Sequence, residues 1–182
     1  MNKKLKLWEL NRVSPEEFSK QEKLPVVVVL DDLRSFENVG SVFRTSDAFN
    51  IQEIILCGIT PVPPHREIHR TALGATDTVK WTYIAKATEA IVKLKSEGYT
   101  IYALEQAEKT IMLQHLKKSI KSPIALVFGN EVNGVNQDVI DQCHAVLEIP
   151  QFGTKHSLNV SVCVGVVLWE CATVLNPSLN VD

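Results

Sequence analysis

Residues 149–170 read IPQFGTKHSLNVSVCVGVVLWE, and this stretch decides how the rest of the chain is organised. It starts at the end of an apolar segment, residues 145–149, that we predict to be a strand. Pro150 has no N–H to donate to a neighbouring strand, so the chain must turn there. Residues 151–156 are predicted to form a loop around Gly153.

The second half of this stretch is apolar and uncharged from Leu158 to Trp169. Ser157 before it is a candidate N-cap, and Asn159 is expected to cap the helix as well. Its many valines favour a strand by propensity alone. About a dozen apolar residues in a row are nevertheless too many for a strand of ~5 residues. We therefore predict a buried helix. A strand, a loop and a helix in this order leave free backbone N–H groups where a polar ligand can bind.

The composition indicates a water-soluble globular protein of 182 residues, with 45% hydrophobic and 22% charged residues. This length suits one main domain. The N-terminus lacks the apolar core of a secretion signal, and no apolar run reaches the ~18 residues of a membrane span. The cysteines are scattered, as expected of a cytoplasmic protein without disulfides or zinc. They are Cys57, Cys143, Cys163 and Cys171.

Apolar segments of strand length alternate along the chain with segments of helical pattern. The predicted strands are residues 24–30, 51–57, 79–84, 99–104, 123–128 and 145–149. The predicted helices are residues 39–49, 65–72, 88–96 and 136–143 and the helix from 158, with residues 111–116 a short helix or loop. This alternation predicts an α/β fold with a mainly parallel sheet flanked by helices. We expect a lead-in segment over residues 1–23, with a helix start at Ser14, and a catalytic domain over residues 24–182.

Ligands of parallel sheets bind beyond the carboxyl ends of the strands, and three loops at such positions carry polar residues. They are residues 38–44, 128–134 and 149–161. No glycine-rich signature of dinucleotide or nucleoside-triphosphate binding follows any strand. His65 and His69 are four residues apart, but two ligands make a weak metal site, so we expect exposed histidines and no metal.

The three loops resemble the three motifs of the SpoU/TrmH family of RNA ribose 2′-O-methyltransferases, within the SPOUT superfamily. The first motif is matched by Asn38, Gly40, Ser41 and Arg44. The second is matched by Phe128, Gly129, Glu131 and Gly134. The third is matched by Ile149, Pro150, Gly153, Ser157, Leu158, Asn159, Val160 and Ser161. Each pattern is weak alone, but three in the right order are specific.

The resemblance implies a SPOUT fold whose C-terminal segment forms a deep trefoil knot, a feature that general rules of chain topology would exclude. It also implies a homodimer and transfer of a methyl group from S-adenosylmethionine to a ribose 2′-hydroxyl. Because the sulfonium is already activated, the protein has to align the reacting atoms and favour loss of the hydroxyl proton.

The family's site residues transfer to matching positions in this chain. The implied catalytic residues are Asn38, Arg44, Glu131, Ser157 and Asn159. The implied cofactor-binding residues are Phe128, Gly129, Asn130, Gly134, Ile149, Gln151, Ser157 and Leu158. We expect Gly129 to let adenosine approach closely. Arg44 is expected to stabilise charge, because neutralising a side chain of pKa ~12.5 at pH 7 costs roughly 7 kcal/mol.

The third motif resembles most closely the branch that methylates the D-loop guanosine of tRNA, which makes tRNA the expected partner. The branch that methylates the wobble position of tRNA ranks second, because its third motif usually differs, and ribosomal RNA methyltransferases rank third. A noncatalytic RNA-binding protein with the same fold is an alternative of another class, and a flavodoxin-like nucleotide binder is a third. No stacking aromatic stands out in the basic loops, so these loops give no separate support for RNA binding.

Overall fold

The computed structural model describes residues 2–10 and 12–176 of the chain, and its centre is a parallel sheet. The strand order is β3-β2-β1-β6-β4-β7-β5, and every strand pairing in it is parallel. The strands are β1 (Leu24–Asp31), β2 (Ile51–Cys57), β3 (Trp81–Ile84), β4 (Thr100–Leu104), β5 (Ile111–Met112), β6 (Ile124–Phe128) and β7 (Ala145–Glu148). The predicted class and the predicted parallel sheet are confirmed.

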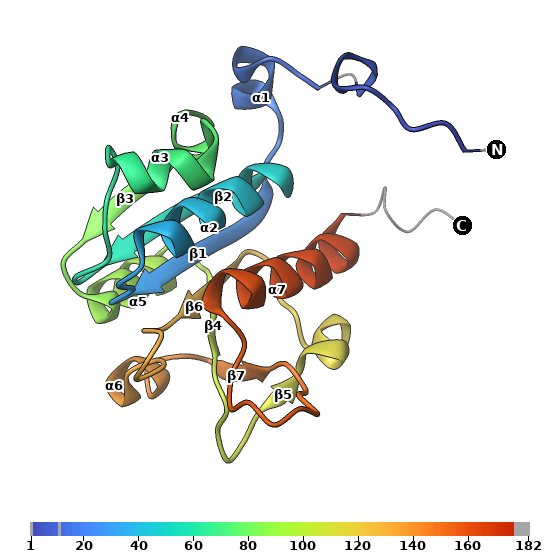
Figure 1. The fold of residues 1–182 in the computed structure, drawn as a ribbon. Helices are drawn as coiled ribbons and strands as arrows, with labels where there is room; N and C mark the ends of the chain where they lie inside the picture. Colours follow the sequence, from blue (N-terminus) through green and yellow to red (C-terminus); the bar gives the residue numbers. More distant parts are fainter. Residues whose placement is uncertain (1, 11, 177–182) are drawn as a thin grey trace.

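Helices cover both faces of this sheet (Figure 1). The helices of the first face are α2 (Phe36–Ala48), α3 (Arg66–Ala72), α4 (Ala75–Thr78) and α7 (Val160–Leu175). The 3₁₀ helix η2 (Leu113–Lys118) packs on the same face. Those of the second face are α5 (Ala87–Ser96) and α6 (Gln137–Ile140). Alternate residues of β1 serve the two cores, with Val28 on the first face and Val29 on the second. Burial on both faces explains why the central strands are continuously apolar.

Strand β7 lies between β4 and β5, which follow one another in the chain. Ala103 of β4 pairs with Val146, and Ile111 of β5 pairs with Leu147. The C-terminal segment therefore runs between the two limbs of one earlier continuous segment before it continues into α7. This insertion is consistent with the trefoil knot that the resemblance implies.

The first polar segment is helical where we predicted a loop followed by a helix from Val39. Helix α2 starts at Phe36 because Ser35 caps it, its hydroxyl accepting a hydrogen bond from the Asn38 N–H at 3.2 Å. Asn38 and Arg44 are therefore both on this helix. Their separation of six residues corresponds to about 9 Å along its axis.

The prediction of a short helix or loop over residues 111–116 is confirmed from Leu113 on and wrong for the two residues before it. Ile111 and Met112 form the edge strand β5, and the 3₁₀ helix η2 follows directly. A two-residue strand has no periodicity that a sequence pattern could reveal, so its place beside β7 is decided by tertiary packing.

Helix α7 starts at Val160, two residues later than predicted, and it is buried on one side only. Val164, Val167 and Leu168 are buried against the sheet and its neighbours. Val162, Val166 and Trp169 are 52%, 39% and 57% exposed. The prediction of a buried helix is confirmed for one face only, because the spacing of these three residues places them together on an outer face.

The lead-in segment stands apart from the sheet at one end of the molecule (Figure 1). It contains the 3₁₀ helix η1 (Leu7–Glu9) and helix α1 (Pro15–Lys20). The predicted helix start is confirmed: Ser14 and Glu17 each bond the other's backbone N–H, as in a capping box. In residues 2–10 and 12–176, no helix is long and apolar enough to cross a membrane.

Candidate active site

A cavity of about 660 Å³ opens beyond the carboxyl ends of β4, β6 and β7. Its size is within the range of small-molecule sites, roughly 300–1,000 Å³. The second and third motif segments form most of its wall. Its lining residues include Phe128, Gly129, Asn130, Glu131, Gly134, Ile149, Gln151, Ser157, Leu158 and Asn159. The structure thus brings together two segments that the sequence separates.

Glu131 joins the second motif segment to the first. Its carboxylate accepts hydrogen bonds from the backbone N–H groups of Arg34 and Ser35 at 2.9 and 3.1 Å, and from the Asn38 side-chain amide at 3.0 Å. Partial burial raises the pKa of Glu131, but these hydrogen bonds outweigh it and hold the pKa below its usual value. The side chain is therefore an anion at neutral pH and an anchor for the start of α2.

Asn159 joins the third motif segment to the same group. Its side-chain N–H donates to the Asn38 side-chain oxygen at 3.1 Å. Its own side-chain oxygen accepts hydrogen bonds from the N–H of Ser161 at 2.9 Å and from the Ser161 hydroxyl at 2.6 Å. Asn159 is thus the N-cap of α7. The prediction that Asn159 caps this helix is confirmed, and the prediction that Ser157 does so is wrong. Hydrogen bonds thus connect the side chains of Glu131, Asn38 and Asn159 in a row.

The second motif segment is a tight turn closed by its own backbone. Asn130 and Gly134 exchange N–H···O bonds of 3.0 and 2.9 Å, and the Asn130 side chain donates to the Asp32 carbonyl at 2.6 Å. A Cβ on Gly129 would lie 2.2 Å from the carbonyl carbon of Gly134. Gly129 is therefore required for closure of the turn, whereas we expected it to admit a ligand.

The predicted site residues fall into three groups. All of the predicted cofactor-binding residues line the cavity, together with Glu131 and Asn159. Asn38 is outside the lining but is bonded to both of these residues. Arg44 is exposed on α2, away from the lining, and it has no hydrogen bond or ion pair within the described part of the chain.

Glu105 and Gln106 also line the cavity, and our sequence analysis missed both. The Glu105 carboxylate accepts from the Val135 N–H at 3.0 Å, and the Gln106 side chain donates to the His156 carbonyl at 2.6 Å. They connect the second and third motif segments from the opposite side. Their position directly after β4 is the signal that could have identified them, because it is the carboxyl end of a parallel strand.

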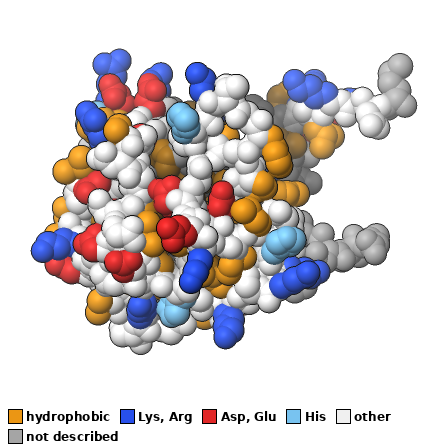
Figure 2. All heavy atoms as spheres, turned by 90° about the horizontal axis from the view of Figure 1, so that it is seen from below, with side chains coloured by type: hydrophobic (Ala, Val, Ile, Leu, Met, Phe, Trp, Pro, Cys, Tyr) orange, Lys and Arg blue, Asp and Glu red, His pale blue; other side chains and the backbone are white. Residues whose placement is uncertain are grey.

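The cavity combines apolar walls with negative charge. Leu104, Phe128, Leu147 and Ile149 supply apolar surface, while Glu105, Glu131 and Glu148 supply carboxylates. Figure 2 shows acidic side chains gathered near the middle of the lower face of the molecule, with most lysines and arginines nearer its outline. Apolar walls with carboxylates suit a ligand that has a flat apolar part and a positive charge.

Comparisons with known proteins agree with this geometry. A "Putative TrmH family tRNA/rRNA methyltransferase" of Staphylococcus haemolyticus is 29% identical over 82% of this chain and 59% of its own length. The "23S rRNA (guanosine-2'-O-)-methyltransferase RlmB" of Pseudomonas aeruginosa is 27% identical over 90% of this chain and 64% of its own. The chain thus spans about three fifths of the length of these relatives.

Among solved structures, an rRNA methyltransferase of Sinorhizobium meliloti with AdoMet bound superposes with a TM-score of 0.72. It is 26% identical, and the match covers 84% of this chain and 60% of the other. The family model described as "SpoU rRNA Methylase family" matches residues 25–169, which include all three motif segments. Two of these segments line the cavity and the first is bonded to both through Asn38, and the match covers most of the chain, so the chain belongs to the SpoU family.

Proposed function

We propose that this protein transfers a methyl group from S-adenosylmethionine to a ribose 2′-hydroxyl of RNA, with residues 24–182 as the catalytic domain. One observation carries the proposal. Glu131, Asn38 and Asn159, each from a different motif, form one hydrogen-bonded chain beside a cavity of cofactor size. Family membership and the AdoMet bound to the Sinorhizobium meliloti relative support it.

The lining of the cavity fits the cofactor. S-adenosylmethionine supplies an activated methyl group on a cationic sulfonium, and carboxylates of Glu105, Glu131 and Glu148 give the cavity the opposite charge. Backbone groups near Ile149 and Leu158 are available to adenine, between apolar side chains. Ser157 lines the cavity, and its hydroxyl has no hydrogen-bond partner in the described part of the chain, so it can bond a ligand.

Arg44 is proposed to act through its positive charge. The guanidinium is exposed and has no carboxylate partner among the described residues, so an RNA phosphate or a developing alkoxide can bind it. Asn38 and Glu131 then act as positioning residues, since their hydrogen bonds hold the start of the helix that carries Arg44.

The D-loop guanosine of tRNA is the first candidate target, on the resemblance of the third motif. A guanosine of ribosomal RNA is the second, because the relative named RlmB acts on 23S rRNA by its printed name. A wobble nucleotide of tRNA ranks third. Mass mapping of ribose methylation in total tRNA and total rRNA, with and without the gene, separates these targets. Loss of one methylated nucleotide identifies the substrate.

A noncatalytic RNA-binding protein of the same fold is the alternative. Calorimetry with S-adenosylmethionine and a methyl-transfer assay on the two RNA pools distinguish the readings. Binding of the cofactor together with transfer supports the enzyme. Unchanged methylation maps and absent cofactor binding would leave only the noncatalytic reading.

We also infer a homodimer that uses the outer face of α7. Val162, Val166 and Trp169 form an exposed apolar stripe. The ring of Phe49, at the end of α2, packs edge-on against the Trp169 ring, with 6.3 Å between the ring centroids. Such a stripe on a soluble protein favours burial against a partner. A Trp169→Arg variant should sediment as a monomer in analytical ultracentrifugation, whereas an unchanged mass would place the interface elsewhere.

A further inference from the structure

The segment of residues 151–156, here called the rim segment, carries an aromatic side chain that the rest of the described chain leaves uncovered. Its two end residues, Gln151 and His156, line the cavity. Phe152 between them is 96% exposed. Exposure of a whole phenyl ring forgoes roughly 1.5–3 kcal/mol of burial free energy, so a fixed exposed phenylalanine beside a ligand site favours a role in binding.

The rim segment is held at both ends. Its start lies three residues after the end of β7 at Glu148, and at its other end the His156 carbonyl accepts the Gln106 side-chain N–H at 2.6 Å. Asn159, just beyond, is fixed by its bonds to Asn38 and Ser161. A ring on a segment anchored in this way is displayed in a defined place, which lowers the entropy lost on binding.

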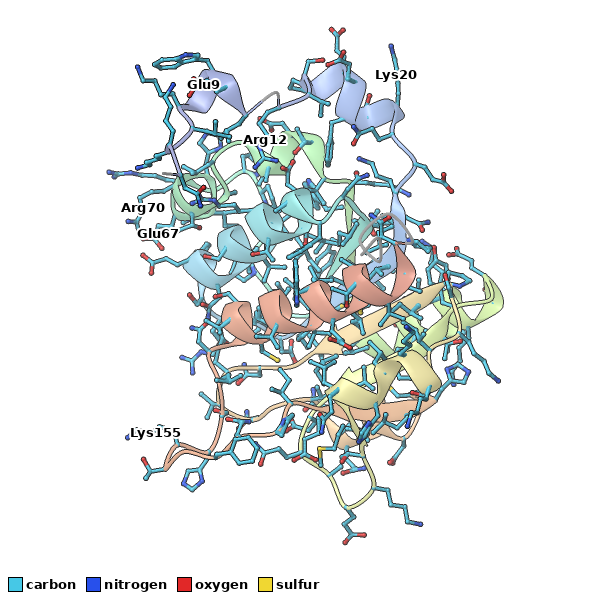
Figure 3. The ribbon with its side chains drawn as sticks, turned by 90° about the vertical axis from the view of Figure 1, so that its right-hand side faces the viewer. Glu9, Arg12, Lys20, Glu67, Arg70 and Lys155 are labelled. Carbon is cyan, nitrogen blue, oxygen red and sulfur yellow. The ribbon has the colours of Figure 1, made fainter. Side chains whose placement is uncertain are left out.

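Positive charge accompanies the exposed ring. Lys155 lies at the outer end of the same segment and points away from the sheet (Figure 3). Arg34 is also exposed, and its own backbone N–H donates to Glu131, which lines the cavity. Neither cation has an ion-pair partner within residues 2–10 and 12–176. Unpaired cations beside an exposed aromatic ring are the combination that binds single-stranded nucleic acid.

We propose that Phe152 stacks on an unpaired base of the RNA next to the nucleotide that is methylated, while Lys155 binds a flanking phosphate. This inference rests on the proposed RNA methyltransferase function and adds a recognition element to it. It implies a substrate whose bases are unstacked near the target, as in a loop, because a base inside a duplex cannot offer its face. It also replaces the expectation that the basic loops lack a stacking aromatic.

The test compares Phe152→Ala, Phe152→Leu and Phe152→Trp, with Val92→Ala as a control, since Val92 is 61% exposed on the remote helix α5. Filter binding gives the Kd for bulk tRNA, calorimetry the Kd for S-adenosylmethionine, and light scattering the molecular mass. The Ala and Leu variants should each weaken RNA binding about 5- to 100-fold, because an alkyl chain cannot replace a ring face. The Trp variant and the control should stay within about threefold of the native protein.

Cofactor affinity and molecular mass should not change in any of these variants. For Lys155→Ala, the plot of the logarithm of the RNA association constant against the logarithm of salt concentration should become less steep by about 0.7, the value for one phosphate contact to a single strand. Native RNA affinity in Phe152→Ala overturns the proposal, and so does full rescue by leucine. A fall in mass for Phe152→Ala overturns it as well, because the ring would then contact a second copy of the chain.

Failure of this inference can be told from failure of the proposed function. If the native protein methylates RNA and Phe152→Ala does so with the native KM for RNA, only the stacking role is lost. If the native protein methylates neither tRNA nor rRNA, the enzymatic proposal itself is lost, whatever the variants bind.

Discussion

The side-chain amide of Asn38 donates to Glu131 at 3.0 Å across 93 residues of sequence. The Asn38 side-chain oxygen accepts in turn from Asn159, which lies 121 residues after Asn38 in the sequence. Asn38 therefore links the second and third motif segments through the first. The Glu131 carboxylate also holds two backbone N–H groups before α2, so its loss would leave several donors without an acceptor.

Glu131→Ala should lower the free energy of unfolding by about 1–2 kcal/mol and reduce methyl transfer, because these donors lose a charged acceptor. Chemical denaturation and a transfer assay measure the two effects. Glu108→Ala is the matched control, since Glu108 is exposed on the connection between β4 and β5. Equal stability of the two variants would contradict an anchoring role.

Glu131 should also give the protein a defined dependence on pH. Its pKa is lowered below the ordinary 4.5 in the folded state, so the stability from the carboxylate is complete above that pH. This stability should be lost as the pH falls through the lowered pKa. The difference in unfolding free energy between the native protein and Glu131→Gln should therefore be largest at neutral pH and shrink in strong acid. A difference that does not vary with pH would be inconsistent with an ionised Glu131.

Arg44→Ala should reduce methyl transfer by about 100-fold or more while the Kd for S-adenosylmethionine stays the same, because Arg44 does not line the cavity. Stability should change by less than about 0.5 kcal/mol, since the side chain is exposed. Lys95→Ala removes an exposed cation from α5 and controls for net charge. Transfer at the native rate in Arg44→Ala would remove Arg44 from the catalytic residues.

Glu105→Gln should weaken S-adenosylmethionine binding several-fold. Both Glu105 oxygens accept a backbone N–H, one from Gln106 and one from Val135, whereas an amide has a single oxygen to accept with, and the cavity also loses a negative charge. Calorimetry measures this, again with an exposed neighbour, Glu108→Gln, as control. If both variants bind the cofactor equally well, Glu105 has no part in cofactor binding and serves only to hold the connection between β4 and β5.

The glycines of the second and third motifs should respond differently to alanine. Gly134 has φ +68°, and an added Cβ would clash with the Glu105 carboxylate. Gly134→Ala should therefore cost about 1–3 kcal/mol of unfolding free energy. Gly153 has open space around it, so Gly153→Ala should change stability by less than about 0.5 kcal/mol. Equal effects in thermal or chemical denaturation would contradict this difference.

Asp31 should destabilise the protein at neutral pH. Burial and then the neighbouring Asp32 raise the pKa of its carboxyl, against a lowering hydrogen bond from Asn136. Ionised Asp31 therefore lowers the free energy of unfolding at pH values above its raised pKa, and it has no such effect below the ordinary pKa of 3.8. Asp31→Asn should therefore raise the Tm at pH 7, and the gain should fade as the pH approaches 3.8. The exposed Asp141→Asn, tested by the same melts, should show no such gain.

Much of the fold was predictable because burial leaves a direct pattern in the sequence. Residues 24–30 and 123–128 are continuously apolar, and both form central strands that helices cover on both sides. The helix start at Ser14 was predictable because both partners of its capping box, Ser14 and Glu17, lie within one turn. The edge strand Ile111–Met112 escaped prediction because its only support is pairing with β7.

The site was partly predictable for the same reason. The motif residues identified the segments that line the cavity, but the contacts between segments depend on which neighbours the fold supplies. Asn159 rather than Ser157 caps α7 because its side chain lies between Ser161 and Asn38, and Glu105 joins the site from a connection that no motif covers.

The sequence by itself determined the alternation of buried strands and helices and the chemical character of three loops, since both follow from local residue types. Only the tertiary structure decided that two of these loops line one cavity with the first bonded to them through Asn38, that one face of α7 is exposed, and that Phe152 is uncovered at the edge of the cavity. The physical reason is that burial and hydrogen bonding between distant segments are fixed by the order of strands in the sheet.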